Sequence, residues 1–150
     1  AGLAGPDRSG RTLHECYPYT TLVGAPELGY ADERPRYKRT PTGMSMAEFR
    51  PIRNRAFDQI VERLSGLEAA DPPLRLRSHP VTAALVTQPT PDGTKAYKHR
   101  EDLLDAVLCA WSGLLWWRHG LGRCQVLGAA AATDDRSATI IAPARPEQRP

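Results

Sequence analysis

The chain is organised around residues 97–111, which read Tyr97-Lys98-His99-Arg100-Glu101-Asp102-Leu103-Leu104-Asp105-Ala106-Val107-Leu108-Cys109-Ala110-Trp111. This stretch predicts a long helix that continues to Gly120. Its second half is apolar on nearly every side, which is typical of a helix buried between other layers. We therefore expect it to be the most buried helix of the fold, with four positions inaccessible to solvent: Ala106, Leu108, Cys109 and Ala110.

The first turns of this helix carry charges that conflict with burial. His99, Asp102 and Asp105 follow at steps of three, which places them along one helical face. Carboxylates that lead into a buried helix are costly unless a cation meets them. The helix dipole alone also favours acidic residues in a first turn, so Asp102 can equally belong to a solvated helix start. Asp105 is harder to explain in that way, because its neighbours are apolar.

Length and composition favour one soluble domain over residues 1–150. The 150 residues are 41% hydrophobic, enough for one ordinary core, and the net charge of +3 is too small to indicate nucleic acid by itself. No stretch approaches the ~20 apolar residues of a membrane helix, and no signal peptide is evident. The three cysteines are widely spaced and lack zinc-ligand spacing, which favours a reducing, cytoplasmic setting.

The segment before the long helix predicts one strand and one good helix. Residues 11–17 alternate as a strand, in which Glu15 shares a face with Leu13, and a short helical turn is expected over 20–24. Ser45 and Glu48 form a capping-box pattern, and helical periodicity continues to about residue 67. Pro51 requires either a kink or a later start near residue 50. Residues 80–86 fit a short helix or a strand.

The segment after the long helix predicts a closing hairpin. Residues 123–127 and 138–142 are short β-type runs joined by 128–137, and 143–150 is a flexible tail. The order of elements indicates a mixed α/β domain. This count leaves too few strands for two helices to cover, so we expect the domain to lack its opening strands.

Three carboxylates are the candidates for chemistry: Glu15, Asp102 and Asp105. If the long helix packs on the first strand, they converge, and two carboxylates about 4 Å apart repel by ~4 kcal/mol at an effective dielectric of 20. Such a group shifts a pKa or binds a hard cation, and all-oxygen ligands favour Mg²⁺ or Mn²⁺. Glu15 can equally be a strand-end salt-bridge partner, and His99 a capping or surface histidine.

A basic run over residues 34–39 is interleaved with Tyr30 and Tyr37. Such a run can bind the phosphates of nucleic acid. The same run is also consistent with an ordinary solvated loop, and both interpretations stay open.

Several of these motifs resemble one family. Glu15-Cys16-Tyr17-Pro18, Tyr37-Lys38 and residues 98–106, in this order, resemble the DUF429 family of predicted ribonuclease H-like nucleases. The resemblance covers most of residues 11–145 and implies a ribonuclease H-like mixed sheet flanked by helices, here lacking its N-terminal strands. It also implies that Glu15, Asp102 and Asp105 are Mg²⁺ or Mn²⁺ ligands. The family's first-strand aspartate has no counterpart in this chain.

The predicted function is that of a metal-dependent nuclease that hydrolyses phosphodiester bonds of nucleic acid. Its catalytic residues are Glu15, Asp102 and Asp105, with His99 either supporting a metal ligand by a hydrogen bond or transferring a proton. Two alternatives are a non-catalytic nucleic-acid-binding or scaffolding module, and a nucleotide-binding protein of the related actin-like fold. No glycine-rich phosphate loop is present, which weakens the second alternative.

Overall fold

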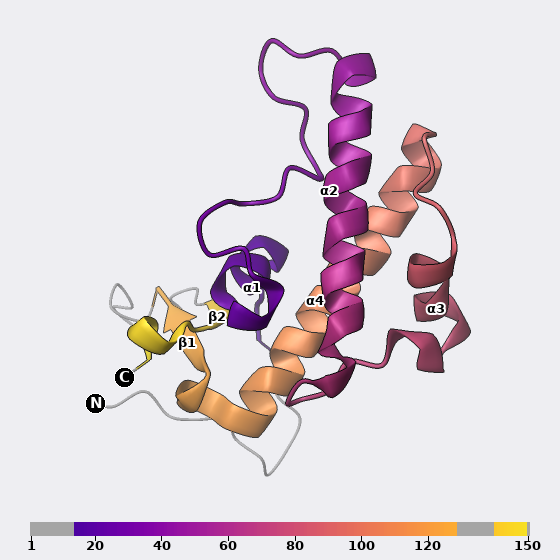
Figure 1. Ribbon diagram of the computed structural model, residues 1–150. Helices are drawn as coiled ribbons and strands as arrows, with labels where there is room; N and C mark the ends of the chain where they lie inside the picture. The colour runs from indigo at the N-terminus through magenta and orange to yellow at the C-terminus, as the bar shows by residue number, and fades with distance from the viewer. Residues whose placement is uncertain (1–13, 129–139, 150) are drawn as a thin grey trace. The chain divides into compact units, whose positions relative to one another are not determined.

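The computed structural model describes residues 14–128 and 140–149 (Figure 1). In these ranges, helices and a small sheet follow in the order α1 (Pro18–Gly24), α2 (Met46–Gly66), α3 (Pro80–Thr87), α4 (Thr94–His119), β1 (Cys124–Leu127) and β2 (Ile140–Pro143). The chain divides into two compact units. The first unit comprises residues 1–32 and 108–150, and the second comprises residues 33–107, so that α4 contributes residues to both.

The second unit is built on α2, whose first turn is fixed by the expected capping box. The Ser45 side-chain oxygen accepts from the Glu48 backbone N–H at 3.3 Å, and Glu48 accepts from the Ser45 N–H at 2.9 Å. These bonds satisfy N–H groups that have no partner within the helix. Pro51 lies inside the helix, so the alternative start near residue 50 is wrong.

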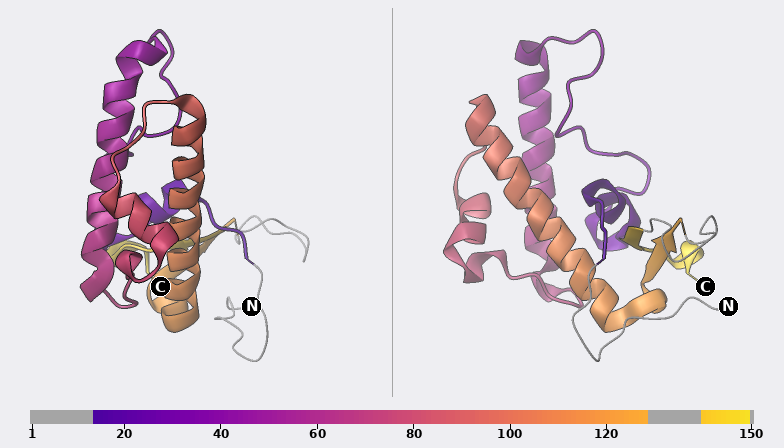
Figure 2. Two further views of the ribbon diagram at one scale, coloured as in Figure 1. Left: turned by 90° about the vertical axis from the view of Figure 1, so that its right-hand side faces the viewer. Right: turned by 180° about the vertical axis from the view of Figure 1, so that it is seen from behind.

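Two side-chain contacts fasten the segment before α4 onto α2. Thr90 donates to Asp58 at 2.5 Å, and Asn54 donates to Asp92 at 2.9 Å. Residues 80–86, which the pattern left between helix and strand, form helix α3, and α3 packs against α2 (Figure 2). A proline at its first position suits a helix start, because that N–H needs no partner.

The first unit holds the sheet, in which β1 and β2 pair antiparallel with Cys124 opposite Pro143. The two predicted β-type runs are therefore confirmed over Cys124–Leu127 and Ile140–Pro143, whereas residues 129–139, which include most of the linker and the start of the second run, lie outside the described part. Helix α1 packs on β2 so closely that a Cβ on Gly24 would lie 2.3 Å from the Pro143 carbonyl oxygen.

The strand expected over residues 11–17 is not formed in the part that the structure describes. Residues 11–13 lie outside it, and in residues 14–17 Glu15 makes a single parallel bridge to Ile140. Pro18 opens α1 immediately afterwards and ends the extended segment. The fold is thus α/β and mostly helical, and its described sheet has two strands. The ribonuclease H-like mixed sheet is not confirmed and stays a prediction.

Helix α4 is buried along one stripe and not all round. The stripe recurs at steps of three and four through the buried residues Tyr97, Glu101, Leu104, Leu108, Trp111 and Leu115. Of the four positions expected to be inaccessible, Leu108 is fully buried, Cys109 is half-buried, and Ala106 and Ala110 are exposed, so the expectation fails at three of them. Apolar residues on the outer face are small or partly exposed, which costs little. Within the described ranges, no helix is both long and apolar enough to cross a membrane.

Candidate functional site

A cluster of three side chains in the second unit joins the loop before α2 to α4. Lys38 Nζ lies 2.5 Å from Asp105 Oδ2, and the Tyr37 hydroxyl donates to Asp105 Oδ1 at 2.9 Å. Tyr37 is fully buried, while the Lys38 and Asp105 side chains are 18% and 22% exposed. Both carboxylate oxygens of Asp105 are therefore held by donors from a single dipeptide.

The position of that dipeptide is fixed from α4 and α2. The Tyr97 hydroxyl donates to the Tyr37 backbone carbonyl at 2.5 Å in a buried setting. The Arg53 guanidinium carbon lies 3.4 Å from the centre of the Tyr97 ring, and Phe57 meets the same ring edge-on with centroids 5.5 Å apart. Aromatic and cation–π contacts of this kind restrict a ring to one orientation.

A second acidic group lies one turn earlier on α4 and is neutralised differently. Lys98 Nζ bridges Glu101 and Asp102, at 2.8 Å from each. The hydrogen bond to Asp102, and after it the bond to Glu101, raises the pKa of Lys98 above its usual value. Glu101 is buried, but the Asp102 side chain is 61% exposed. Asp102 is thus a solvated helix residue with a local lysine partner.

The predicted site residues are placed as follows. Asp105 is half-buried within the Tyr37–Lys38–Asp105 cluster, and Asp102 and His99 are exposed on the same helix. Glu15 is exposed and belongs to the first unit, where its backbone carbonyl accepts from the Ile141 N–H at 2.9 Å. The roles of Glu15 and His99 stay predictions.

Sequence reasoning missed that Asp105 is held by Tyr37 and Lys38 and that Arg53 lies behind them. The Tyr37-Lys38 dipeptide was part of the family resemblance, but nothing local connects it with a residue 67 positions later. Arg53 falls on the buried stripe of α2, so a charged residue at a core-facing helical position was the available signal.

The carboxylates suit a hard cation in donor type, but they do not form a complete centre. Nowhere in residues 14–128 or 140–149 do three His, Cys, Asp or Glu side chains gather as a metal centre requires. Asp102 and Asp105 offer oxygen donors of the kind that Mg²⁺ prefers. In this arrangement each is already paired with a lysine ammonium group, so a cation would have to displace Lys38 from Asp105.

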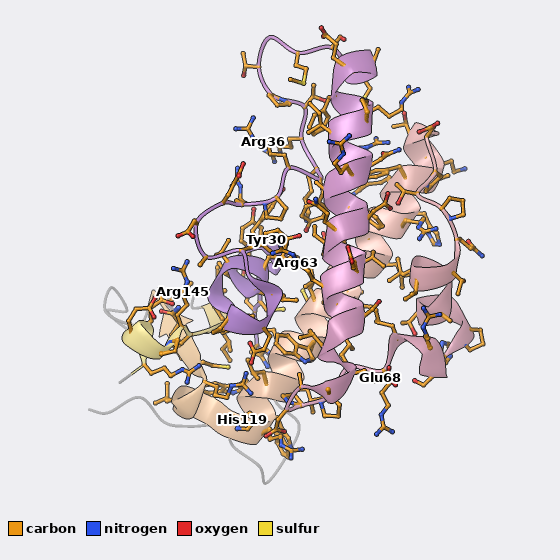
Figure 3. All side chains as sticks on the ribbon, in the orientation of Figure 1. Tyr30, Arg36, Arg63, Glu68, His119 and Arg145 are labelled. Carbon is orange, nitrogen blue, oxygen red and sulfur yellow. The ribbon has the colours of Figure 1, made fainter. Side chains whose placement is uncertain are left out.

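The basic run over residues 34–39 is largely accessible, but its aromatic neighbours are not. Arg34, Arg36 and Arg39 are exposed, and Figure 3 shows Arg36 on the loop that leads to α2. Tyr30 is 7% exposed and Tyr37 is fully buried. Neither ring is therefore available to a nucleic-acid base, because stacking needs an open ring face.

A shallow cavity of about 410 Å³ lies in the first unit, between the segment after α1 and the chain after β2. Arg145 lines it and is fixed by two backbone carbonyls, donating from Nε to Val23 at 3.1 Å and from its terminal nitrogen to Ala31 at 2.8 Å. None of the predicted site residues lines this cavity. Comparison of the chain with protein-family models, with curated proteins and with solved structures gave no match.

Proposed function

We propose that the chain is a divalent-metal-dependent nuclease domain of the DUF429 type, which hydrolyses phosphodiester bonds of nucleic acid. The Tyr37–Lys38–Asp105 cluster of the second unit belongs to its active site. One observation supports this: the Tyr37-Lys38 dipeptide and the helix aspartate, both parts of the family resemblance, are in direct contact although 67 positions separate Lys38 from Asp105.

The roles of the chain's own residues follow from their contacts. Asp105 and Asp102 would hold Mg²⁺ or Mn²⁺, which when bound activates water and neutralises charge on the phosphodiester. Tyr37 orients the Asp105 carboxylate through its hydroxyl. Lys38 exchanges Asp105 for a phosphate oxygen of the substrate, because its flexible stem lets the ammonium group move between two anions.

The test combines metal binding with cleavage. Mn²⁺ binding to the chain is measured by calorimetry, and cleavage of DNA and of RNA is measured with Mn²⁺ present. We expect weak binding and slow cleavage, both reduced at least about tenfold in Asp105→Asn, since an interaction with a charged group contributes about 1.5–3 kcal/mol. Glu15→Gln tests whether that residue takes part. Glu68→Gln is the matched control, because Glu68 is an exposed carboxylate in the short 3-10 turn that follows α2 (Figure 3).

The proposal is contradicted if the wild-type chain binds no Mn²⁺, or if Asp105→Asn binds and cleaves like the wild type. A loss in Glu68→Gln equal to that in Asp105→Asn would also contradict it, because the effect would then be general to surface charge.

A second candidate function, nucleic-acid binding without cleavage, is favoured by the exposed arginines at positions 34, 36 and 39. Exposed arginines contact phosphates without regard to base sequence. Retained binding of DNA or RNA in the presence of a chelator, with no cleavage when Mn²⁺ is added, would identify this function and exclude the first.

A further inference from the structure

Arg53 is a buried cation whose contacts are unusual. Its relative exposure is 3%, and among the described residues no carboxylate pairs with it. Its Nε and a terminal N–H both donate to the Asn54 side-chain oxygen, at 3.1 and 2.9 Å, and its guanidinium covers the Tyr97 ring. An effective penalty of several kcal/mol attends a buried ion, so an apolar side chain would be the less costly occupant of this position.

The contacts beyond Arg53 lead step by step to Asp105. Arg53 and Phe57, both on α2, hold the Tyr97 ring between them. The hydroxyl of that ring holds the Tyr37 carbonyl, and the Tyr37-Lys38 dipeptide holds both oxygens of Asp105. Each step is a direct contact. The Arg53 guanidinium carbon lies 3.4 Å from the centre of the Tyr97 ring, and the hydrogen bonds that follow are 2.9 Å or shorter.

We infer that Arg53 is a positioning residue, which fixes through Tyr97 the point at which Lys38 meets Asp105. The inference rests on the proposed function for its catalytic consequence, but the position of Lys38 can be measured without it. A planar guanidinium can stack on a ring while its N–H groups bind one acceptor, and neither an apolar side chain nor lysine can do both. Asn54, which accepts from Arg53, also donates to Asp92 and so anchors the stack to the segment before α4.

The experiment first measures how readily the Lys38 amine is modified, with no metal or nucleic acid present. The rate of reductive methylation of Lys38 is followed by mass spectrometry in the wild-type chain and in two variants. In Arg53→Met the stack on Tyr97 is lost. In Tyr97→Phe the ring and its packing remain, but the hydrogen bond to the Tyr37 carbonyl is lost, so this variant tests the same link with little disturbance to the core.

We expect Lys38 to be modified about three- to tenfold faster in both variants, because release from Asp105 exposes the amine. Arg55→Met is the matched control, since Arg55 is exposed on the same helix, and it should leave the rate unchanged. Unchanged Lys38 modification in both Arg53→Met and Tyr97→Phe overturns the inference. Equal acceleration in Arg55→Met overturns it as well.

Cleavage supplies the second measurement. We expect Tyr97→Phe to lower kcat at least about tenfold with KM within about threefold, because misplacing a group by about 1 Å can cost about 100-fold in rate. A rise in KM with unchanged kcat would overturn the positioning role. If the wild-type chain cleaves nothing, the proposed nuclease function fails, while the methylation rates still decide whether Arg53 positions Lys38.

Discussion

Asp102 and Asp105 are one turn apart on α4, yet their surroundings differ in kind. Asp102 is exposed and paired with a lysine of its own helix, whereas Asp105 is half-buried and is held by a separate segment of the chain. A local pair on an exposed helix surface gains little, because water screens the charges and both side chains lose rotational freedom. A half-buried pair with an added tyrosine hydroxyl keeps more of its attraction. The residue to examine is therefore Asp105.

A double-mutant cycle compares the two ion pairs directly. For Lys38→Met and Asp105→Asn, we expect a coupling of about 1–3 kcal/mol in the free energy of unfolding, in the range for contacting residues of one network. For the control pair, Lys98→Met and Asp102→Asn, we expect about 0.5 kcal/mol or less, as for other exposed pairs. Urea unfolding of the single and double variants measures both, and equal couplings would contradict the assignment of Asp105 as the structurally fixed carboxylate.

The reactivity of the Cys124 thiol is the second property that can be predicted for a single residue. Burial raises the pKa of its thiol to about 12, so almost none of the reactive thiolate is present at pH 8. Cys16 and Cys109 are only half-buried. A disulfide reagent at pH 8 should therefore modify Cys124 last, and Cys124→Ala should leave the fast phase of the reaction intact. Loss of the fast phase in that variant would show that Cys124 is accessible.

Among the elements, α1 is held on the sheet by a close backbone approach. A Cβ on Gly24 would lie 2.3 Å from the Pro143 carbonyl oxygen, so the sheet and helix must separate to admit it. We expect Gly24→Ala to cost about 1–3 kcal/mol, the range for overpacking. Gly66 is the last residue of α2, has a helical backbone conformation and faces open space, so an added methyl group meets nothing. Gly66→Ala should therefore raise the free energy of unfolding by about 0.4–1 kcal/mol, because alanine leaves the unfolded chain less conformational freedom. Thermal unfolding of the two variants measures the contrast, and a stabilised Gly24→Ala would contradict the close packing.

The two faces of α4 differ in burial, although both carry apolar residues. Leu108 is fully buried, whereas Leu114 is 45% exposed on the outer face. Leu108→Ala should cost about 2–5 kcal/mol, as for other buried leucines, and Leu114→Ala about 0.5 kcal/mol or less, as for most surface positions. Urea unfolding distinguishes the two, and a cost below about 0.5 kcal/mol for Leu108→Ala would mean that α4 is peripheral to the core.

At the scale of the whole molecule, charge is distributed unevenly along the chain. The net charge is +3, but residues 34–39 alone contribute four positive charges and no negative one. Because the neighbouring tyrosines are buried, any contact of this loop with nucleic acid has to come from its basic side chains. Binding that depends on phosphate contacts falls steeply with salt.

Duplex DNA binding in the presence of a chelator tests this distribution. With Arg36→Gln and Arg39→Gln combined, we expect weaker binding and a slope of log K against log salt that is smaller by about 1.8, or about 0.9 per lost phosphate contact. Arg75→Gln with Arg77→Gln is the matched control, since these are two exposed arginines elsewhere in the second unit. Equal losses in both double variants would show that the binding responds to net charge and not to the loop.

The sequence alone determined the features that depend on neighbours along the chain. Helix α2, with its Ser45–Glu48 cap, the long helix α4 and the two β-type runs followed from patterns that span three or four residues, because caps and helical or strand periodicity act over that distance. The prominence of Asp105 followed in the same way from a charge among apolar neighbours.

Only the tertiary structure decided which side chains are buried and which distant segments are in contact. It left Glu15 with one isolated bridge, exposed Ala106 and Ala110 on an apolar helix, and buried Tyr37 within a largely exposed basic run. It also brought Lys38 onto Asp105, with Arg53 behind Tyr97. Patterns of neighbouring residues could not predict these outcomes, because the free energy of a buried charge or ring depends on the groups that folding places around it. In this chain those groups come from up to 68 positions away.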